Sequence, residues 1–400
     1  MKVGEKEYRS IWLNEENRKS VCVIDQRRLP FSFEVLTLRS VEDVCEAISG
    51  MAVRGAPLIG ATAAWGVFLS FIEHSKSRDV LSLVETDAQR LKATRPTAVN
   101  LAWAVNHMTG VLSGHQDEEI LRKAAVSLCD LEAERSRNIG LYGLPLIDGI
   151  SRQKGGEAVD ILTHCNAGWL ACVDYGTALA PVYMAHDKGI RVHVWVSETR
   201  PRNQGSRLTA WELSNHGVPC TLVTDSTAGH LMQNGMVDMV IVGCDRATAN
   251  GDVANKTGTY LKALAARDNG VPFYSAFPVS TFDLSISRPD QISIEERGGD
   301  EVRKFTGIPA SFTDAPTEGA GSTSTQETRE APGATSPQLT TEVPGAMSPR
   351  ATQESVYICQ PDVPVSNYGF DVTPARLITG LITDRGVCNA NREAIKKILS

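Results

Sequence analysis

The second half of the chain alternates short apolar runs with helical segments, and this alternation restricts the possible folds more than any other feature. From about residue 146, apolar runs typical of β-strands occur near residues 158–164, 191–197, 220–225, 238–243 and 271–277, with predicted helices between them. Parallel neighbours need a long crossover, which is usually a helix. The order therefore predicts a Rossmann-like, doubly wound parallel sheet.

The first 145 residues show a different pattern, in which helical periodicity dominates. We expect one short strand, at Val21–Ile24. Helices are predicted over Val41–Ser49, Ile59–His74, Val80–Lys92, Val99–Leu112 and Glu118–Arg137. A length of 400 residues also favours two domains. We therefore predict an α/β protein with a small, mostly helical N-terminal domain (residues 1–145) and a parallel-sheet domain (residues 146–400).

The stretch from residue 314 to residue 355 fits neither pattern. It is rich in Pro, Gly, Ser, Thr and Ala and contains a degenerate repeat, EAPGATSP and EVPGAMSP. Such a composition buries too little apolar surface to offset the entropy of ordering the chain. We predict a disordered insertion in the second domain. After it, a capped helix is expected from Thr373 or Pro374, and an earlier helix over residues 226–235 is expected to begin with Ser226 and Thr227 as caps.

Composition excludes several classes of protein. The formal net charge is −7 and no basic block is present, so nucleic acid is not an expected partner. The nine cysteines form no CxxC pair, and the first ten residues have no apolar signal region, which together predict reduced thiols in the cytoplasm. Gly55–Ile72 is free of charge over 18 residues, but Gly, Thr and Ser dilute it. We expect a buried helix there, not a membrane span.

No cofactor is predicted from the sequence. The eight histidines form no HxH or HExxH pair, and no GxGxxG follows a strand at the start of the second domain. We therefore expect neither a metal ion nor a nicotinamide.

Reactive side chains follow two of the predicted strands. The run VIVGCDRATANGDVANK (residues 240–256) ends its apolar part at Asp245 and continues as a polar loop that carries Lys256. The run AVDILTHCNAG (residues 158–168) places Cys165 just past another strand. Ligands of open α/β sheets bind at the carboxyl ends of the strands. Cys165 and Asp245 are therefore predicted to face one crevice, although 80 positions separate them in the sequence.

Each of these side chains also has a structural interpretation. A cysteine at a strand end is often a small buried apolar residue, and Asp245 beside Arg246 can form a structural ion pair. Lys256 can be a solvated lysine at a helix start, and Arg95 before a proline can be a loop residue.

Longer motifs carry a resemblance to a known family. The chain resembles methylthioribose-1-phosphate isomerases, which are related to the regulatory subunits of the eukaryotic initiation-factor exchange complex, over nearly its whole length except residues 314–355. The motifs that carry the resemblance are IDQRRLP (Ile24–Pro30), MAVRGAPLIGATAAWG (Met51–Gly66), RPTAVNL (Arg95–Leu101), THCNAG (Thr163–Gly168), DYGTALAP (Asp174–Pro181), ETRPRNQG (Glu198–Gly205), TAGHLM (Thr227–Met232), CDRATANGDVANKTGTY (Cys244–Tyr260) and FDVTP (Phe370–Pro374).

The resemblance implies an aldose–ketose isomerisation of 5-methylthioribose 1-phosphate in methionine salvage. It implies Cys165 and Asp245 as the catalytic pair, in either an enolate or a hydride-shift route. It also implies a set of residues that bind the phosphate and the sugar hydroxyls: Arg54, Gly55, Ala56, Arg95, Gln204, Asn255 and Lys256. The expected partners are the small-molecule substrate and, in a homodimer, a second copy of the chain.

Two other functions remain open at the level of the sequence. One is a related sugar-phosphate isomerase that acts on 5-deoxyribose 1-phosphate or ribose 1,5-bisphosphate. The other is a non-enzymatic regulatory subunit, against which the joint presence of Cys165 and Asp245 argues. The sequence does not place the residues around carbon 5 of the sugar, where an apolar wall would favour a methylthio group and extra cations a second phosphate.

Overall fold

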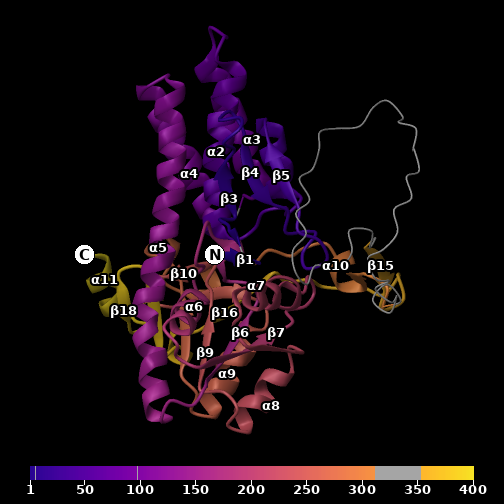
Figure 1. Ribbon diagram of the computed structural model, residues 1–400, viewed down its shortest axis with the longest axis vertical. Coiled ribbons are helices and arrows are strands. Elements are labelled where there is room, and N and C mark those ends of the chain that lie inside the picture. Colours follow the sequence, from indigo (N-terminus) through magenta and orange to yellow (C-terminus); the bar gives the residue numbers. More distant parts are fainter. Residues whose placement is uncertain (5, 97, 311–352) are drawn as a thin grey trace, which may run out of the picture.

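A computed structural model describes the chain from residue 1 to residue 400, apart from residues 5, 97 and 311–352. The molecule is elongated, with a helical N-terminal part above a part built around a parallel sheet (Figure 1). The 36-residue helix α5 (Glu118–Gln153) runs along both parts. It is longer than predicted and continues through residue 145, so the domain boundary at that residue stays a prediction.

The N-terminal part packs its helices around one central helix. The predicted helices and the strand at Val21–Ile24 are confirmed, with ends that differ by a few residues except in α5. A three-stranded antiparallel sheet, in the order β3-β4-β5, lies beside the helices. The elements are β1 (Lys2–Val3), β2 (Lys6–Glu7), β3 (Ile11–Leu13), β4 (Val21–Ile24), β5 (Val35–Leu38), α1 (Val41–Ser49), α2 (Ala56–His74), α3 (Val80–Thr94) and α4 (Val99–Gly114).

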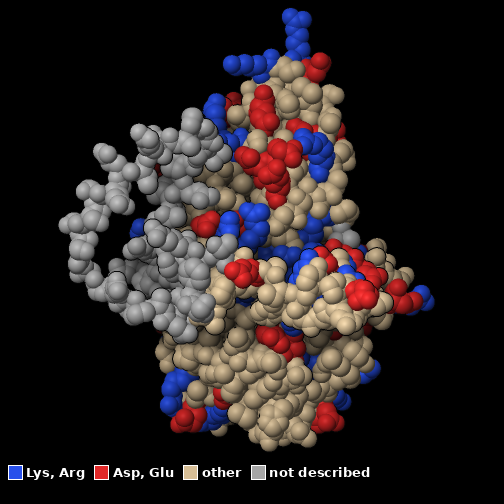
Figure 2. All heavy atoms as spheres, turned by 90° about the vertical axis from the view of Figure 1, so that its right-hand side faces the viewer, with Lys and Arg blue, Asp and Glu red and all other residues tan. Residues whose placement is uncertain are grey.

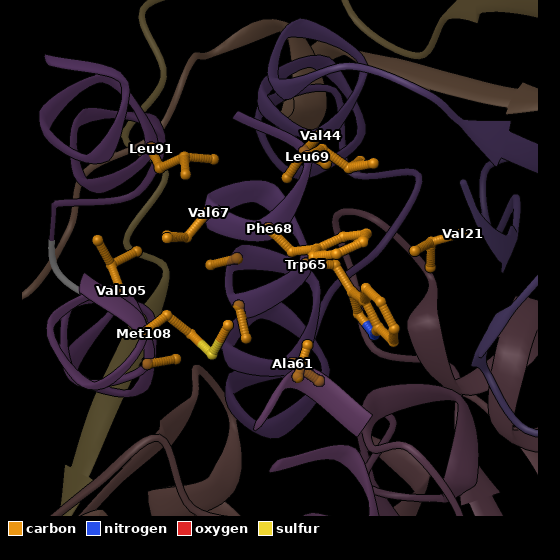
Figure 3. Close-up of a cluster of buried hydrophobic side chains, with 14 of the residues drawn as sticks. Val21, Val44, Ala61, Trp65, Val67, Phe68, Leu69, Leu91, Val105 and Met108 are labelled. Atoms are coloured by element: carbon orange, nitrogen blue, oxygen red, sulfur yellow. The ribbon is translucent and has the colours of Figure 1, made fainter. Parts of the chain in front are cut away.

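Helix α2 is the centre of this core. Trp65, Phe68 and Leu69 of α2 are buried in the hydrophobic core. In Figure 3, Trp65 and Phe68 extend towards the side of Val21, whereas Val67 of the same helix lies on the side of Leu91 and Val105. By length and composition α2 resembles a membrane span, but 83% of its apolar window is buried inside the protein. The prediction of a buried helix is confirmed.

The C-terminal part contains a seven-stranded sheet in the order β18-β17-β12-β9-β6-β7-β8. All neighbouring strands are parallel except β17 and β18. The five predicted strands are confirmed, whereas the strands β17 and β18 were not predicted. The bounds are β6 (Val159–His164), β7 (Val192–Ser197), β8 (Cys220–Val223), β9 (Met239–Val242), β12 (Phe273–Ala276), β17 (Gly380–Thr383) and β18 (Gly386–Cys388).

The order in which the chain adds strands to the sheet reverses between the neighbouring strands β6 and β9. From β6 the chain proceeds outward to β7 and β8, then returns to β9 on the other side of β6 and continues to β12 and β17. The carboxyl ends of strands at such a switch point form the crevice in which open α/β sheets bind ligands. The helices of this part are α6 (Ala180–Asp187), α7 (Ala210–His216), α8 (Thr227–Gln233), α9 (Thr259–Asp268) and α11 (Arg392–Leu399).

A second, four-stranded sheet corrects one sequence prediction. Asn255 and Lys256 do not lie in a loop: they end β11 (Val253–Lys256), which pairs with β16 (Phe370–Thr373). The strand forms because its partner returns from more than a hundred residues further along the chain. The sheet has the order β13-β10-β11-β16, and its other strands are β10 (Arg246–Thr248) and β13 (Phe282–Asp283).

One predicted helix does not form, and another begins where predicted but without its predicted side-chain cap. Thr373 ends β16, and only a single 3-10 turn, Ala375–Leu377, follows Pro374, because pairing with β11 holds this segment extended. At α8, the Ser226 side chain makes no capping hydrogen bond, since its own backbone is already helical (φ −74°, ψ −23°) and does not aim the hydroxyl at the free amides.

A short peripheral unit precedes and follows the predicted insertion. It contains α10 (Asp300–Arg303) and the antiparallel pair β14 (Lys304–Gly307) and β15 (Glu354–Tyr357). Most of the predicted insertion lies outside the described residues, but its last two residues, Glu354 and Ser355, belong to β15. The remaining elements are single helical turns at Trp169–Ala171, Gly205–Thr209, Val279–Thr281 and Pro289–Gln291.

Candidate active site

One cavity collects every residue that the sequence placed in the site. It lies where the first turn of α2 and the end of α3 meet the carboxyl edge of the large sheet and strand β11. In Figure 2, Lys and Arg side chains gather at mid-height of the molecule, between its upper and lower parts. The predicted residues that line the cavity are Arg54, Gly55, Ala56, Arg95, Cys165, Gln204, Asp245, Asn255 and Lys256.

Gly55 lets the two parts of the molecule approach each other closely at the cavity. Its φ is +88°, and a Cβ at this position would lie 2.2 Å from the carbonyl oxygen of Ala171. Any other residue would therefore meet both strain and collision. This close approach brings Arg54 and the N-terminal end of α2 against the loop after β6. The amino end of a 19-residue helix carries partial positive charge, which favours a bound anion.

Cys165 is held in an unusual backbone conformation directly after β6. Its φ is +65°, a region that residues with a side chain rarely occupy. The Cys165 amide donates to Thr199 Oγ1 at 2.8 Å, and its carbonyl accepts from Thr209 Oγ1 at 2.7 Å. The surrounding structure therefore fixes this strained residue, as is common at functional sites. Burial raises the pKa of the thiol, although Arg54 and Lys256 oppose the rise, so the neutral thiol is favoured.

Asp245 follows β9 on the other side of the switch point. Its amide donates to the carbonyl of Ala254 at 2.9 Å. Burial raises the pKa of its carboxyl group, while the positive charges of Lys256 and Arg54 oppose the rise. A carboxyl group that retains its proton can act as a general acid. The neighbouring Arg246 has a carboxylate partner other than Asp245, because its Nη1 lies 3.6 Å from Asp283 Oδ2.

The cationic side chains around the cavity are incompletely paired. Arg54 donates to the carbonyl of Asn166 at 3.1 Å, but its Nε has no hydrogen-bond partner among the described residues. Arg95 Nη1 and Gln204 Oε1 are likewise buried and unpartnered there. A buried polar atom without a partner costs about 1–3 kcal/mol, so it indicates a place for a bound ligand. Burial also lowers the pKa of both arginines, which a bound anion would reverse.

The structure adds charged residues that the sequence did not place. Arg202, Glu295 and Arg297 also line the cavity. Glu301 holds both arginines, at 2.7 Å from Arg202 and 2.9 Å from Arg297. Burial opposes ionisation of Glu301, but these hydrogen bonds lower its pKa to about 2. Arg202 lies inside the ETRPRNQG motif and was therefore visible in the sequence, whereas nothing in the local sequence around Glu295 or Arg297 indicates a site.

A buried carboxyl group supports Arg54 from behind. Asn166 accepts from Arg54 through its side-chain oxygen, and its amide nitrogen donates to Glu212. Glu212 is fully buried, which raises its pKa to about 8. Gly168 leaves the necessary room, because a Cβ there would lie 1.8 Å from Glu212 Oε1. Arg54 is thus positioned by a chain of polar contacts that reaches into the sheet part.

The arrangement combines an anion site with two proton-carrying groups. Arginine, lysine and a helix terminus can hold a phosphate, while the Asp245 carboxyl group and the Cys165 thiol line the same cavity. Within the described part of the chain, no group of three or more His, Cys, Asp or Glu side chains is placed to hold a metal ion.

Comparisons with known proteins agree on one family. Residues 52–390 match the model of the initiation factor 2 subunit family. The methylthioribose-1-phosphate isomerase of Desulfatibacillum aliphaticivorans is 48% identical over 403 residues, which cover 100% of this chain and 98% of that protein.

Two solved structures share the fold over nearly the whole chain. The 5-methylthioribose 1-phosphate isomerase of Pyrococcus horikoshii OT3 is 36% identical with a TM-score of 0.77, covering 98% of this chain and 96% of that one. The structure described as translation initiation factor eIF-2B subunit delta from A. fulgidus is 34% identical with a TM-score of 0.75, covering 98% and 99%. The chain belongs to the initiation factor 2 subunit family, among its methylthioribose-1-phosphate isomerase members.

Proposed function

We propose that this protein converts 5-methylthioribose 1-phosphate into 5-methylthioribulose 1-phosphate. One observation carries the proposal: Cys165, Asp245 and a set of anion-binding residues line a single cavity, in a chain that is 48% identical along its length to a protein of that name. A regulatory subunit that only binds partners would not need a carboxyl group and a strained thiol in the same cavity as an anion site.

The reaction has a particular difficulty at the anomeric carbon. A phosphate occupies the anomeric oxygen, so the ring cannot open through a free hydroxyl group. We propose that Asp245 gives its proton to the ring oxygen as the bond between that oxygen and carbon 1 breaks. A hydrogen then moves from carbon 2 to carbon 1, and the carbon 2 hydroxyl loses its proton to give the ketone.

Cys165 would lie beside the migrating hydrogen. A thiolate could remove it as a proton, but burial raises the pKa of this thiol and so disfavours the thiolate. The neutral thiol fits a direct hydride shift from carbon 2 to carbon 1, which needs no base at the migrating hydrogen. We therefore propose the hydride route.

The remaining residues would bind and orient the substrate. Arg54 and Lys256 would meet the phosphate with the backbone at Gly55 and Ala56, and Arg95 has an unpartnered nitrogen for an anionic oxygen. Gln204 and Asn255 can bond sugar hydroxyl groups or phosphate oxygens.

We further propose a cytoplasmic homodimer with a Rossmann-like second domain. All nine cysteines are free, which suits a reducing compartment. Trp103, Leu141 and Tyr142 on α4 and α5 are each at least 40% exposed, and such apolar side chains suit an interface between two copies.

Proton NMR of the purified protein with 5-methylthioribose 1-phosphate tests the proposed function. Ketose signals should grow in the presence of excess chelator and without added nucleotide, because the proposed mechanism uses neither a metal ion nor a nucleotide cofactor. Loss of activity with the chelator would overturn the metal-free mechanism. A higher kcat/KM for ribose 1,5-bisphosphate or 5-deoxyribose 1-phosphate would replace the proposed substrate by the alternative one.

A further inference from the structure

Two buried threonine hydroxyl groups hold the backbone of Cys165, one on each side of its Cα atom. The Thr199 hydroxyl oxygen accepts from the Cys165 amide at 2.8 Å, and the Thr209 hydroxyl group donates to the Cys165 carbonyl at 2.7 Å. Both threonines are 0% exposed, and both lie outside the lining of the active-site cavity. They can therefore act on a substrate only through the residues that they hold.

Thr199 is itself fixed by Asp225. The Thr199 amide donates to one carboxylate oxygen of Asp225 at 2.9 Å, and the Arg200 amide donates to the other at 2.8 Å. The Thr199 hydroxyl group donates to the carbonyl of Ser197 at 2.9 Å, so its oxygen is left to accept from Cys165. The acceptor of the Cys165 amide is thus held just past the carboxyl end of β7.

Thr209 supports two residues of the site. It lies at the end of the helical turn Gly205–Thr209, which directly precedes α7. Besides donating to Cys165, its hydroxyl oxygen accepts from the Asn166 side chain at 3.1 Å, and Asn166 in turn accepts from Arg54. Loss of the Thr209 hydroxyl group would therefore disturb both the thiol and the arginine.

The positive φ of Cys165 explains why its backbone needs these contacts. A residue with a side chain is strained at +65° and relaxes towards negative φ unless its surroundings prevent this. Rotation about the N–Cα bond swings the Cβ atom and the thiol relative to β6, which precedes Cys165. A reacting group that is displaced by about 1 Å can cost a large part of the rate.

We infer that Thr199 and Thr209 are positioning residues, which keep the Cys165 thiol at the point where the hydrogen of the substrate passes from carbon 2 to carbon 1. This inference rests on the proposed function. Among the described residues that line the cavity, the Thr199 hydroxyl group contacts Cys165 alone, whereas Thr209 also supports Arg54 through Asn166. Thr199 should therefore affect turnover, and Thr209 both turnover and the binding of the phosphate.

Variants that remove one hydroxyl group and keep the shape of the side chain test the inference. We expect Thr199→Val to lower kcat about tenfold or more while KM changes by less than about twofold, because a displaced thiol slows the reaction and leaves the anion site intact. Thr199→Ser keeps the hydroxyl group and should stay within about threefold of the native kcat. Thr209→Val should lower kcat and also raise KM.

Thr163→Val is the matched control. Thr163 is a buried residue of β6, and its hydroxyl group donates to the carbonyl of Ile241 at 2.8 Å. The variant loses a comparable hydrogen bond close to the site but none of the contacts of Cys165. It should leave kcat within about twofold of the native value.

A double variant shows whether Thr199 acts through Cys165. When Cys165→Ala is already present, Thr199→Val should lower the residual kcat by less than about twofold, because the effects of residues that act through one group are not additive. A merely structural threonine would lower kcat by the same factor with and without the thiol. That result would overturn the inference, as would a kcat of Thr199→Val equal to that of Thr163→Val.

Hydrogen exchange separates this inference from the function on which it rests. Mass spectrometry of the peptide that contains Cys165 should show faster exchange of its amide in Thr199→Val than in Thr199→Ser or Thr163→Val, because valine offers no acceptor. If the native protein does not turn over 5-methylthioribose 1-phosphate, the proposed function fails, whatever the exchange shows. If it does, and the Cys165 amide exchanges equally fast in all three variants, Thr199 does not hold Cys165 and the inference fails.

Discussion

The surroundings of Cys165 and Asp245 shift the pKa values of both side chains in the same direction. The Asp245 carboxyl group and the Cys165 thiol both have raised pKa values, because burial disfavours their charged forms more than the nearby cations favour them. A protonated acid and a neutral thiol suit the opening of a ring and the passage of a hydride. A neutral thiol is a poor nucleophile, so the raised pKa of Cys165 does not favour attack of its sulfur on an electrophile.

Replacement of either central residue should abolish most of the turnover. We expect Cys165→Ser and Asp245→Asn each to lower kcat by at least about a hundredfold, the scale of a positioned acid or base, while substrate still binds. Steady-state kinetics and calorimetric titration measure the two effects separately. Cys359→Ser is the control and should leave kcat within about twofold. A near-normal kcat in the Cys165 or Asp245 variant would refute its assignment.

The fate of the migrating hydrogen distinguishes the two routes. In D₂O, a hydride shift carries the hydrogen of carbon 2 to carbon 1 without exchange, so the product should contain almost no deuterium at carbon 1. Proton abstraction by a thiolate would allow exchange with solvent. Mass spectrometry of the product after a single turnover measures the deuterium content at carbon 1 directly. Extensive deuteration at carbon 1 would show that Cys165 acts as a base in spite of its raised pKa.

At the scale of elements, local pattern and long-range pairing contribute differently to what a sequence can predict. Helix α1 and strands such as β6 follow from periodicity alone, and the carboxyl ends of β6 and β9 place Cys165 and Asp245 at one edge. Strand β11 could not be predicted, because its partner β16 lies more than a hundred residues away. Glu295 and Arg297 reach the cavity through the fold of a peripheral segment, which no local motif indicates.

The predicted insertion should be dispensable if the β14–β15 pair is kept. Gln353 accepts from Arg207 at 3.1 Å and donates to the carbonyl of Arg27 at 3.2 Å. A short Gly/Ser linker from Thr313 to Gln353 should therefore leave the Tm nearly unchanged and kcat within a few-fold of the parent value. The reason is that loop length changes closure entropy slowly.

A longer deletion provides the contrast. Joining Thr313 to Val356 also removes two residues of β15 and the contacts of Gln353, so this variant should have the lower Tm of the two. Thermal unfolding and activity assays of both proteins make the comparison. Aggregation or loss of activity in the shorter deletion would assign a structural or functional role to the segment.

At the scale of the whole molecule, the site depends on contact between both parts. Arg54 comes from the N-terminal part, yet it is held through Asn166 by Glu212, which lies in α7 of the sheet part. Helix α5 contacts both α2 and α6 and so keeps the two parts together. Neither part alone carries all the residues that line the cavity.

Glu212 should make stability depend on pH. Its pKa is about 8 in the folded protein, compared with about 4.3 for a glutamate in an unfolded chain. Between these values the folded state holds a proton that the unfolded state has released. The contribution of this group to stability is therefore complete below pH of about 4 and is lost as the pH rises towards 8.

The variant Glu212→Gln should remove that dependence. Urea unfolding at pH 5.5 and pH 8 should show a smaller loss of stability in this variant than in the native protein, because glutamine does not titrate. Glu157→Gln, at an exposed site, is the control and should behave as the native protein does. An equal loss of stability in Glu212→Gln and the native protein would show that Glu212 is ionised throughout this range.

A crystal structure of the Asp245→Asn variant with 5-methylthioribose 1-phosphate bound tests the central claim most directly. The phosphate should contact Arg54 and Lys256, carbons 1 and 2 should face Cys165, and the ring oxygen should lie within hydrogen-bond distance of the side chain at position 245. Binding elsewhere would contradict the account, for example in the separate surface hollow lined by Arg385 and Lys397. A sugar that binds in this cavity with carbons 1 and 2 turned away from Cys165 would contradict it equally.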